Sequence, residues 1–476
     1  RSIWVTGVQT CALPICFESV EHVKRYTTTG MATDQGKTSN MTTLGLLAET
    51  LSRSIPQVGT TTFRPPYTPV SFGALVGSAR GVLFDPIRKT PIHEWAQQHG
   101  AKFENVALWR RAWYFLQAGE DMHAAVSREC RAVRNSVGIF DGSTLGKIEV
   151  VGADAAEFMN RIYVNSWLKL EPGKCRYGVM LKEDGYIFDD GVVARLAPDR
   201  FHVTTTTGGA ARVLAHMEDY LQTEWPNLNV FLTSTTDHWA VIAVQGPRAR
   251  DVIAPLITDI DLSPLAFAHM TMRTGHICGV PTRLFRVSFT GELGYEINVP
   301  ADHALAVWEA IYARGQSYGI TPYGTETMHV LRAERGFIIV GQDTDGTVTL
   351  DDVGLGAMVG QAKADFIGKR SLLRSDVLAQ GRRQLVGLLT DEPCLLIDEG
   401  AQIVIDPNQR IPMKILGHVT SSYHSNTCGR SIALALVANG RALKGSTVYA
   451  TTPTGFAAVR ITEPCFFDLN AERVHG

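Results

Sequence analysis

Two adjacent carboxylates, Asp189 and Asp190, are the first residues of this sequence whose type and position could carry chemistry. They lie in YGVMLKEDGYIFDDGVVARL (177–196), a pattern that predicts a strand, a turn at Asp184-Gly185 and a second strand. Neighbouring side chains on a strand point to opposite faces, so one aspartate can face a cavity while the other faces solvent. In a cavity among apolar strands, a carboxylate would have a perturbed pKa and could accept a proton or a hydrogen bond. The residues alone favour the simpler interpretation, a solvated pair near the turn.

A third carboxylate of interest, Glu296, lies in SFTGELGYEINVP (288–300). The pattern places Glu292 in a turn and Glu296 on the strand that follows, among Tyr295 and Ile297. If this strand position faces inward, the carboxylate must be paired or hydrogen-bonded, for example to the amide-like donor edge of a ligand. The residues alone again favour a simpler interpretation, an edge-strand glutamate in water.

Two glycine-rich stretches do not meet the requirements of nucleotide sites. GLGAMVG (354–360) reads GxGxxxG and does not follow a clear strand of a βαβ unit, so we do not interpret it as a dinucleotide fingerprint. TDQGKTS (33–39) contains a GKT, but a triphosphate loop would need glycine at the position of Met31. Neither stretch predicts a phosphate site.

The composition excludes several classes of protein. The 476 residues carry 45 Lys and Arg against 47 Asp and Glu, a net charge of −2, so no basic surface for nucleic acid or anionic membrane is expected. No apolar run reaches the length of a transmembrane helix. The eight cysteines are scattered and form no CxxC pair, which indicates reduced thiols in a cytoplasmic protein and no metal site.

The elements that must position the carboxylates alternate between helix and strand. Residues 119–138 predict a helix, and 138–152 predict a strand, a turn and a strand. A strand at 200–207, a helix at 208–225 and a strand at 238–246 follow. Antiparallel hairpins mixed with helices favour an α+β fold with largely antiparallel sheets over a doubly wound parallel sheet. From Arg383 onward, short β-rich segments separated by turns predict a small all-β barrel, the segments being 384–390, 401–405, 415–422, 446–452 and 456–462.

The pattern also predicts where the chain divides. Residues 1–16 resemble translated sequencing-adapter read-through and are expected to be an artefact, so that the native amino terminus is missing. Residues 17–61 are interpreted as the end of a truncated dinucleotide-binding domain, with an amphipathic helix at 41–55. Residues 62–94 form a Pro-rich linker. We expect the large α+β domain at 95–370 and the barrel domain at 371–476.

Several motifs, taken in order, resemble the glycine-cleavage T-protein (aminomethyltransferase) superfamily across about four-fifths of the chain. They are EVVGADAAEFMNRI, YGVMLKEDGYIFDDGVV, WAVIAVQGPRAR, SFTGELGYEINVP, LRAERGFIIVGQD and LGHVTSSYHSNTCGRSIALALV. The segments HVKRYTTTGMATDQGKTSN and FRPPYTPV look like a particular branch, the alpha subunits of heterotetrameric sarcosine oxidases. The resemblance implies an aminomethyltransferase-like folate-binding fold followed by the barrel.

The resemblance also implies a reaction, cofactors and partners. In this branch sarcosine is oxidised to glycine with formation of hydrogen peroxide, and tetrahydrofolate captures the one-carbon unit as 5,10-methylenetetrahydrofolate. FAD and the sarcosine site belong to the beta subunit, FMN lies at the alpha–beta interface, and an upstream domain binds NAD. The implied partners are the beta, gamma and delta subunits.

The same resemblance assigns site residues. Asp190 matches the family's key carboxylate, near the folate N10 nitrogen, and Glu296 matches the glutamate that binds the pterin edge. Further matches to the wall of the folate pocket are Thr204, Thr206, Leu145 and Tyr177.

One departure separates this chain from the aminomethyltransferases: in TETMHVLRAERG, Met328 occupies a position where they carry an arginine. This argues against transfer from a lipoyl-bound aminomethyl group and fits the oxidase branch. Three alternatives stay open: an aminomethyltransferase, a demethylase subunit acting on another N-methyl amine such as dimethylglycine, and a non-catalytic folate-binding or assembly module.

Overall fold

A computed structural model describes residues 17, 19–31, 35–62, 68 and 70–476. The chain forms two compact units, Arg1–Pro86 and Ile87–Gly476. The predicted adapter-derived stretch, 1–16, lies outside the described residues, as do 63–67 and 69 of the predicted linker.

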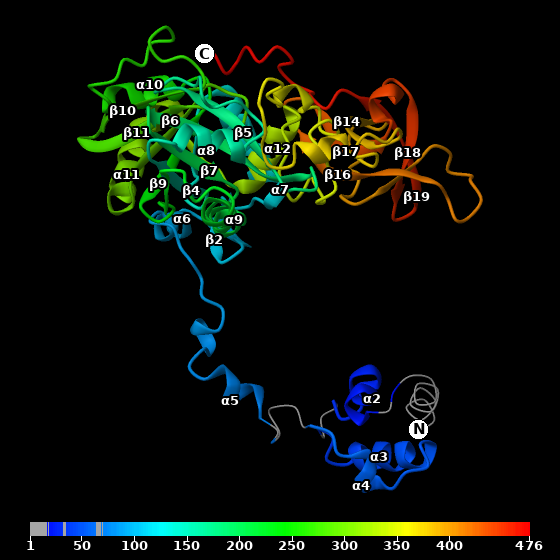
Figure 1. Cartoon of the computed structure of the whole chain (residues 1–476). Helices are drawn as coiled ribbons and strands as arrows, with labels where there is room; N and C mark the ends of the chain where they lie inside the picture. The colour runs from blue at the N-terminus through cyan, green and yellow to red at the C-terminus, as the bar shows by residue number, and fades with distance from the viewer. Residues whose placement is uncertain (1–16, 18, 32–34, 63–67, 69) are drawn as a thin grey trace. The chain divides into compact units, whose positions relative to one another are not determined.

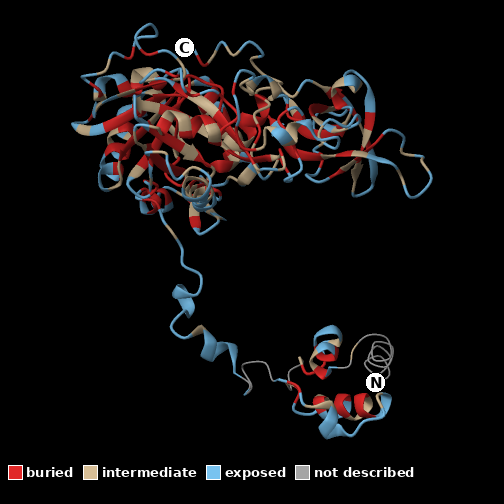
Figure 2. Cartoon of the chain, in the orientation of Figure 1, coloured by how far each residue is buried: buried red, intermediate tan, exposed pale blue. Residues whose placement is uncertain are grey.

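The smaller unit is built of short helices: α2 (Val20–Thr27), α3 (Ser39–Thr50), α4 (Ile55–Val58) and α5 (Phe72–Val76). Val20 and Val23 of α2 pack against Leu44 and Leu47 of α3 in a small apolar core. The helix expected at 41–55 is therefore present, but it ends at Thr50 and the chain turns before α4 begins. In contrast to α2 and α3, α5 buries none of its residues (Figure 2).

Two antiparallel-rich sheets form the centre of the larger unit (Figure 1). The first has the strand order β5-β6-β7-β4-β8, and the second the order β10-β11-β12-β9-β3-β13. Among these strands only β13 and β3 pair in parallel. The strands of the first sheet are β4 (Gly146–Val151), β5 (Cys175–Leu181), β6 (Ile187–Ala197), β7 (Arg200–Thr205) and β8 (Phe231–Ser234). Those of the second are β3 (Gly138–Asp141), β9 (Trp239–Gln245), β10 (Thr271–Ile277), β11 (Val280–Arg286), β12 (Gly294–Pro300) and β13 (Thr321–Pro322).

Helices cover these sheets, and a small hairpin of β1 (Ala101–Val106) and β2 (Trp109–Phe115) lies beside them. The helices are α6 (His93–Gln98), α7 (Met122–Asn135), α8 (Ala155–Ile162), α9 (Ala210–Thr223), α10 (Ala249–Ile253), α11 (Ala304–Gly315) and α12 (Thr325–Glu334). Helix α7 begins where the Asp121 carboxylate accepts a hydrogen bond from the Ala124 N–H at 2.8 Å, and it buries Ala125, Cys130 and Val133 as its spacing predicts.

The carboxy-terminal strands close into a barrel in the order β14-β17-β16-β15-β18-β19. They are β14 (Arg383–Thr390), β15 (Gln402–Val404), β16 (Ile415–Ser425), β17 (Arg430–Ala438), β18 (Thr447–Thr452) and β19 (Gly455–Thr462). Five coincide with the predicted segments. β17 was not predicted as a strand, because its apolar run lacks the alternation of a half-exposed strand; seven consecutive residues, 431–437, are buried.

The structure therefore confirms the predicted fold class, an α+β aminomethyltransferase-like fold with a carboxy-terminal barrel. In Figure 1 the barrel strands occupy one end of the larger unit, and the segment after β19 returns from the barrel towards β10 and α10. This return is held by Arg286, which donates hydrogen bonds to the carbonyl oxygens of Val474 and His475 at 2.8 Å each. None of the helices in the described ranges is long and apolar enough to cross a membrane.

Candidate functional site

A cavity of about 240 Å³ opens between the two central sheets and α12. All six residues that the sequence assigned to a site line it: Leu145, Tyr177, Asp190, Thr204, Thr206 and Glu296. They come from both sheets and from the turns beside them. Backbone folding thus brings together residues that lie up to 151 positions apart in the sequence.

Asp189 and Asp190 lie on β6, and neither side chain is the solvated carboxylate that the residues alone suggested. Asp189 is fully buried and accepts hydrogen bonds from the N–H of Thr206 at 3.1 Å and its Oγ1 at 2.9 Å. Asp190 faces the cavity and accepts a hydrogen bond from the Tyr177 hydroxyl at 2.5 Å. The solvated interpretation was wrong because the strand lies inside a sheet, between β5 and β7, and not at a surface turn.

The surroundings of Asp190 favour its protonated form. Burial raises the pKa of Asp190 to about 7, against the opposing effect of the Tyr177 hydrogen bond, and the neighbouring Asp189 raises this pKa further. A carboxyl group with a pKa near neutrality can give up or take a proton at physiological pH. Asp190 is therefore suited to general acid–base chemistry on a molecule bound in the cavity.

Glu296 lies on β12, which pairs with β11 on one side and β9 on the other. The edge-strand interpretation was wrong, since β12 is an interior strand. Burial raises the pKa of Glu296 to about 7, opposed by the positive charge of Lys147. Among the residues that the structure describes, none donates a hydrogen bond to the Glu296 carboxylate, which opens on the cavity. A buried carboxylate without a donor is a strong acceptor for a ligand.

The threonines and Leu145 shape the walls. Thr204 Oγ1 donates to the Val192 carbonyl oxygen at 2.8 Å, which leaves its lone pairs free to accept a hydrogen bond. Thr206 Oγ1 donates to Asp189 and accepts from the Gly209 N–H at 3.1 Å, so it acts mainly to hold the turn after β7. Leu145 contributes apolar surface from the turn before β4.

Further lining residues were not singled out from the sequence. Phe140 and Tyr323 stack with ring centroids 5.2 Å apart. His329 of α12 lines the cavity, and burial together with the charge of Arg332 lowers its pKa to about 3, so its imidazole is neutral. Met328, noted only for replacing an arginine, lies beside it. No motif joins these residues, because they come from separate elements that only the folded chain brings together. Further apolar wall residues are Val192, Val241, Ala243, Phe289 and Ile338–Val340.

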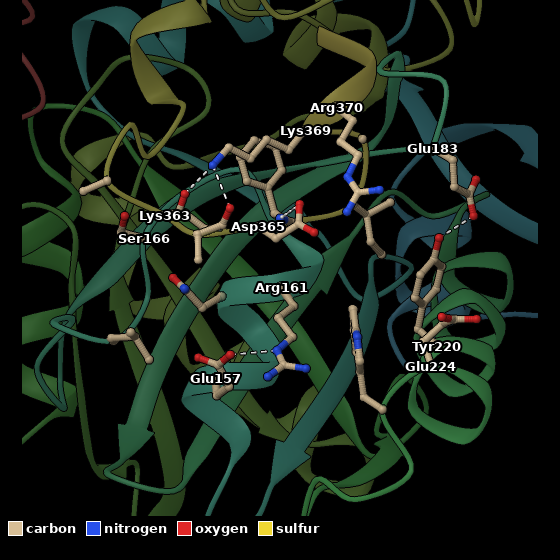
Figure 3. Close-up of a pocket in the computed structure, with 18 of the residues that line it drawn as sticks. Glu157, Arg161, Ser166, Glu183, Tyr220, Glu224, Lys363, Asp365, Lys369 and Arg370 are labelled. Carbon is tan, nitrogen blue, oxygen red and sulfur yellow. Dashed lines mark hydrogen bonds and ion pairs between the residues drawn. The ribbon is translucent and has the colours of Figure 1, made fainter. Parts of the chain in front are cut away.

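A second, larger cavity of about 1080 Å³ lies between α8, the end of α9 and residues 362–371 (Figure 3). Several of its polar groups have partners within the protein: Arg161 pairs with Glu157 at 2.7 Å, and Tyr220 donates a hydrogen bond to Glu183 (Figure 3). The Lys363 ammonium donates to the carbonyl oxygens of Tyr163 and Asn165. None of the six predicted site residues lines this cavity, and its size alone does not make it the candidate site.

The class of protein follows from these features together with the comparisons. The GCVT N-terminal domain family matches residues 92–363, and the glycine cleavage T-protein C-terminal barrel domain family matches 383–468. The aminomethyltransferase of Streptomyces coelicolor is 33% identical over 69% of this chain and 86% of its own length. The crystal structure of glycine cleavage system aminomethyltransferase T from Bartonella henselae aligns with a TM-score of 0.70 and 25% identity, over 80% of this chain and 99% of that chain. The chain belongs to the glycine-cleavage T-protein (aminomethyltransferase) family.

Within that class, the chain is similar to a particular protein. Sarcosine oxidase subunit alpha of Corynebacterium sp. (strain P-1) is 54% identical over 465 residues, 96% of this chain. The sarcosine oxidase A3 domain family also matches residues 9–78. These findings confirm the resemblance predicted from the sequence. The chain spans about half the length of that relative, 48%.

Proposed function

We propose that this chain is the folate-binding part of a sarcosine oxidase alpha subunit. In the complete enzyme, sarcosine would be oxidised to glycine with release of hydrogen peroxide, and the one-carbon unit would pass to tetrahydrofolate as 5,10-methylenetetrahydrofolate. The observation that carries the proposal is one cavity holding two carboxylates, Asp190 and Glu296, each with a pKa raised to about 7 by burial.

The lining residues fit a reduced folate. The pterin ring has an edge of N–H donors, which matches the unpartnered Glu296 carboxylate, and the apolar and aromatic walls match the faces of its rings. The volume of about 240 Å³ is slightly below the usual range of ligand pockets, about 300–1000 Å³. The cavity would therefore enclose the ring system and leave the glutamate tail outside.

Tetrahydrofolate, when bound, supplies the two amine nitrogens that take up the one-carbon unit. Asp190, as the ionised carboxylate, would accept the proton that one of these nitrogens loses. Tyr177 would hold the Asp190 carboxylate in place through its hydroxyl. Glu296 would orient the ring, with Thr204, Thr206 and Leu145 completing the wall.

The proposal also covers the partners, cofactors, domain boundaries and cellular location of the protein. The partners are the beta, gamma and delta subunits, and FAD, FMN and NAD belong to the complete complex. Residues 17–61 would be the end of a dinucleotide-binding domain, 62–94 a linker, 95–370 the folate-binding domain and 371–476 the barrel domain. We place the protein in the cytoplasm, where the six cysteines of the described residues, all unpaired, would stay reduced.

Met328 favours the oxidase over an aminomethyltransferase, because it places an uncharged thioether in the cavity wall where the transferases carry an arginine. A demethylase subunit for another N-methyl amine would need the same folate cavity. The two differ in the amine oxidised, so turnover of sarcosine against dimethylglycine by the reconstituted complex separates them.

Binding of tetrahydrofolate to the full chain, measured anaerobically by calorimetry, tests the proposal. We expect binding that Glu296→Gln weakens at least tenfold at pH 8, since hydrogen bonds to a charged acceptor contribute about 1.5–3 kcal/mol. Glu183→Gln, in the other cavity, is the matched control and should bind as the parent does. A folded chain without affinity for tetrahydrofolate, or equal weakening by both substitutions, would contradict the assignment.

A further inference from the structure

A buried lysine lies directly behind the wall of the folate cavity. Lys147 is on β4 with 0% of its surface exposed. Its ammonium donates hydrogen bonds to the carbonyl oxygens of Ser143 at 2.9 Å and Leu145 at 2.7 Å. Gly142, Thr144 and Leu145 of this turn all line the cavity. The lysine thus ties the turn to the strand that follows it.

Strand register places Lys147 and Glu296 in the same layer between the two sheets. Lys147 pairs with Thr204 of β7, which lines the cavity, so both side chains share that face of the first sheet. Two residues further along β4, Glu149 accepts a hydrogen bond from Arg283 of the second sheet at 2.6 Å. Side chains two residues apart on a strand share a face, so Lys147 projects into the same inter-sheet layer as Glu149.

The second sheet contributes the matching row. Asn298, two residues beyond Glu296 on β12, contacts His202 of β7 at 3.4 Å. Glu296 and Asn298 thus form a polar row on β12 that faces the row of Lys147 and Glu149 on β4. Glu296 and Lys147 lie at the end of these rows that is nearer the cavity. Lys147 is the one cation that acts on Glu296 among the described residues, and it lowers the pKa of that carboxyl against the effect of burial.

The need to fill space does not explain why a charged lysine occupies this buried position. Removing a charge from water is unfavourable, and an apolar side chain of the same volume would fill the space more easily. The Lys147 ammonium contacts carbonyl oxygens only and makes no direct ion pair among the described residues, so its positive charge is not cancelled at contact distance. Burial lowers the pKa of Lys147 to about 8, so the ammonium is largely charged at pH 7 and below, where its field acts on the neighbouring carboxylate.

We infer that Lys147 is a positioning residue of the folate site: it anchors the Gly142–Leu145 wall and supplies the positive charge that keeps the Glu296 carboxylate ready to accept hydrogen bonds from the ring of the folate. The inference rests on the proposed function of the cavity and adds the residue on which ring recognition depends. Lys147 touches no substrate itself and acts through Glu296.

Other titratable groups face this pair and must be controlled. Asp141, Asp237 and Arg88 act on Lys147, and Asp190 in the same cavity titrates in the same range as Glu296. The measurements are therefore made in the full chain carrying Asp190→Asn, which removes the second titration.

The test is the affinity for tetrahydrofolate, measured anaerobically between pH 6 and 9. Affinity in the Asp190→Asn parent should fall as the pH is lowered through the pKa of Glu296. Lys147→Met removes the charge and should move this midpoint upward by about one pH unit, with binding about fivefold weaker at pH 7. Lys147→Arg keeps the charge and should restore the midpoint. Lys363→Met removes another lysine that donates to backbone carbonyls and should leave the midpoint unchanged.

Lys147→Gln, which is neutral but can still donate to the carbonyls, replaces the methionine variant if that chain does not fold. Uniformly weaker binding with an unchanged midpoint in the neutral variants would overturn the inference and leave Lys147 a packing residue. Absence of binding by the unsubstituted chain would instead contradict the proposed function, and with it this inference.

Discussion

At the residue scale, two neighbouring aspartates lie in different environments because their side chains project to opposite sides of one strand. Asp189 has its oxygens satisfied by Thr206 and by the N–H of Asp190. Asp190 has one donor, the Tyr177 hydroxyl, and the cavity beyond it. The adjacent pair therefore combines a structural acceptor with a group whose proton can be exchanged.

The proton of Asp190 leads to a pH prediction. If ionised Asp190 accepts the proton during one-carbon capture, the yield of 5,10-methylenetetrahydrofolate should rise with pH through about 7. Tyr177→Phe removes the hydrogen bond that lowers the pKa of Asp190, so this rise should move to higher pH. Asp190→Asn should reduce capture about 100-fold or more above pH 7, where the parent carboxylate is ionised, and should abolish the rise with pH. The measurement is product yield in the reconstituted complex.

Peroxide formation from sarcosine serves as the internal control, because the oxidation would take place on another subunit and should not change in either variant. A Tyr177→Phe profile that coincides with the parent would remove the tyrosine from the mechanism. Full capture by Asp190→Asn would remove the aspartate.

At the element scale, Glu129 joins three elements near the cavity. This glutamate of α7 is fully buried and accepts hydrogen bonds from the Phe115 N–H at 2.7 Å, the Gly324 N–H at 3.0 Å and Thr327 Oγ1 at 2.7 Å. It thereby holds β2 and the start of α12 against α7. Burial nevertheless raises the pKa of Glu129 to about 7, since these donors only partly offset the loss of water.

This shift predicts how stability depends on pH. A carboxyl whose pKa is higher in the folded than in the unfolded chain binds its proton more tightly when folded. The resulting stabilisation is complete below the unfolded pKa of about 4.5 and is lost as the pH rises through about 7. We expect the free energy of unfolding to fall between pH 5 and 8, with Glu129 contributing up to ~3 kcal/mol.

Urea unfolding at several pH values tests this expectation. Asp190 and Glu296 act in the same direction, so the fall should be shallower, but not absent, in Glu129→Gln. A parallel pH dependence in the parent and in this variant would contradict the role of Glu129.

At the scale of the whole larger unit, a buried ion pair lies where the two-sheet part meets the barrel. Arg332 of α12 donates to Asp343 Oδ2 at 2.5 Å and to Ser421 Oγ of β16 at 2.6 Å. Asp343 also accepts hydrogen bonds from Thr420 Oγ1 at 2.5 Å and from the Ile339 N–H at 2.9 Å. Since Ile339 lines the cavity, the same aspartate supports the cavity wall and the barrel contact.

Removing the charge of Asp343 should therefore affect both. Asp343→Asn leaves the Arg332 guanidinium buried without its counter-ion, which typically destabilises a protein by about 3–5 kcal/mol. We expect a lower midpoint of urea unfolding and weaker binding of tetrahydrofolate. Asp376→Asn, from an exposed pair with Arg374, is the control and should change neither. Equal stability of the two variants would show that the barrel is held by its apolar contacts alone.

The sequence determined much of the fold because its patterns are local. The helix at α7 follows from apolar spacing and an aspartate cap, and the β5–β6 hairpin follows from Asp184-Gly185, where the glycine adopts a φ of +88° that other residues rarely take. The strand β17 was missed because a strand buried on both faces has no alternation. The α+β class and the barrel needed only the order of such elements.

For the candidate site, too, some features could be predicted from the sequence and others depend on the tertiary structure. The order of motifs pointed to Asp190, Glu296 and their neighbours, but the residues by themselves favoured solvated carboxylates. Only tertiary structure decided otherwise, because burial and the loss of water are properties of packed sheets and not of a strand considered alone. The same holds for Lys147 and His329: their chemical environment depends on which elements pack against them, and no local pattern encodes that contact.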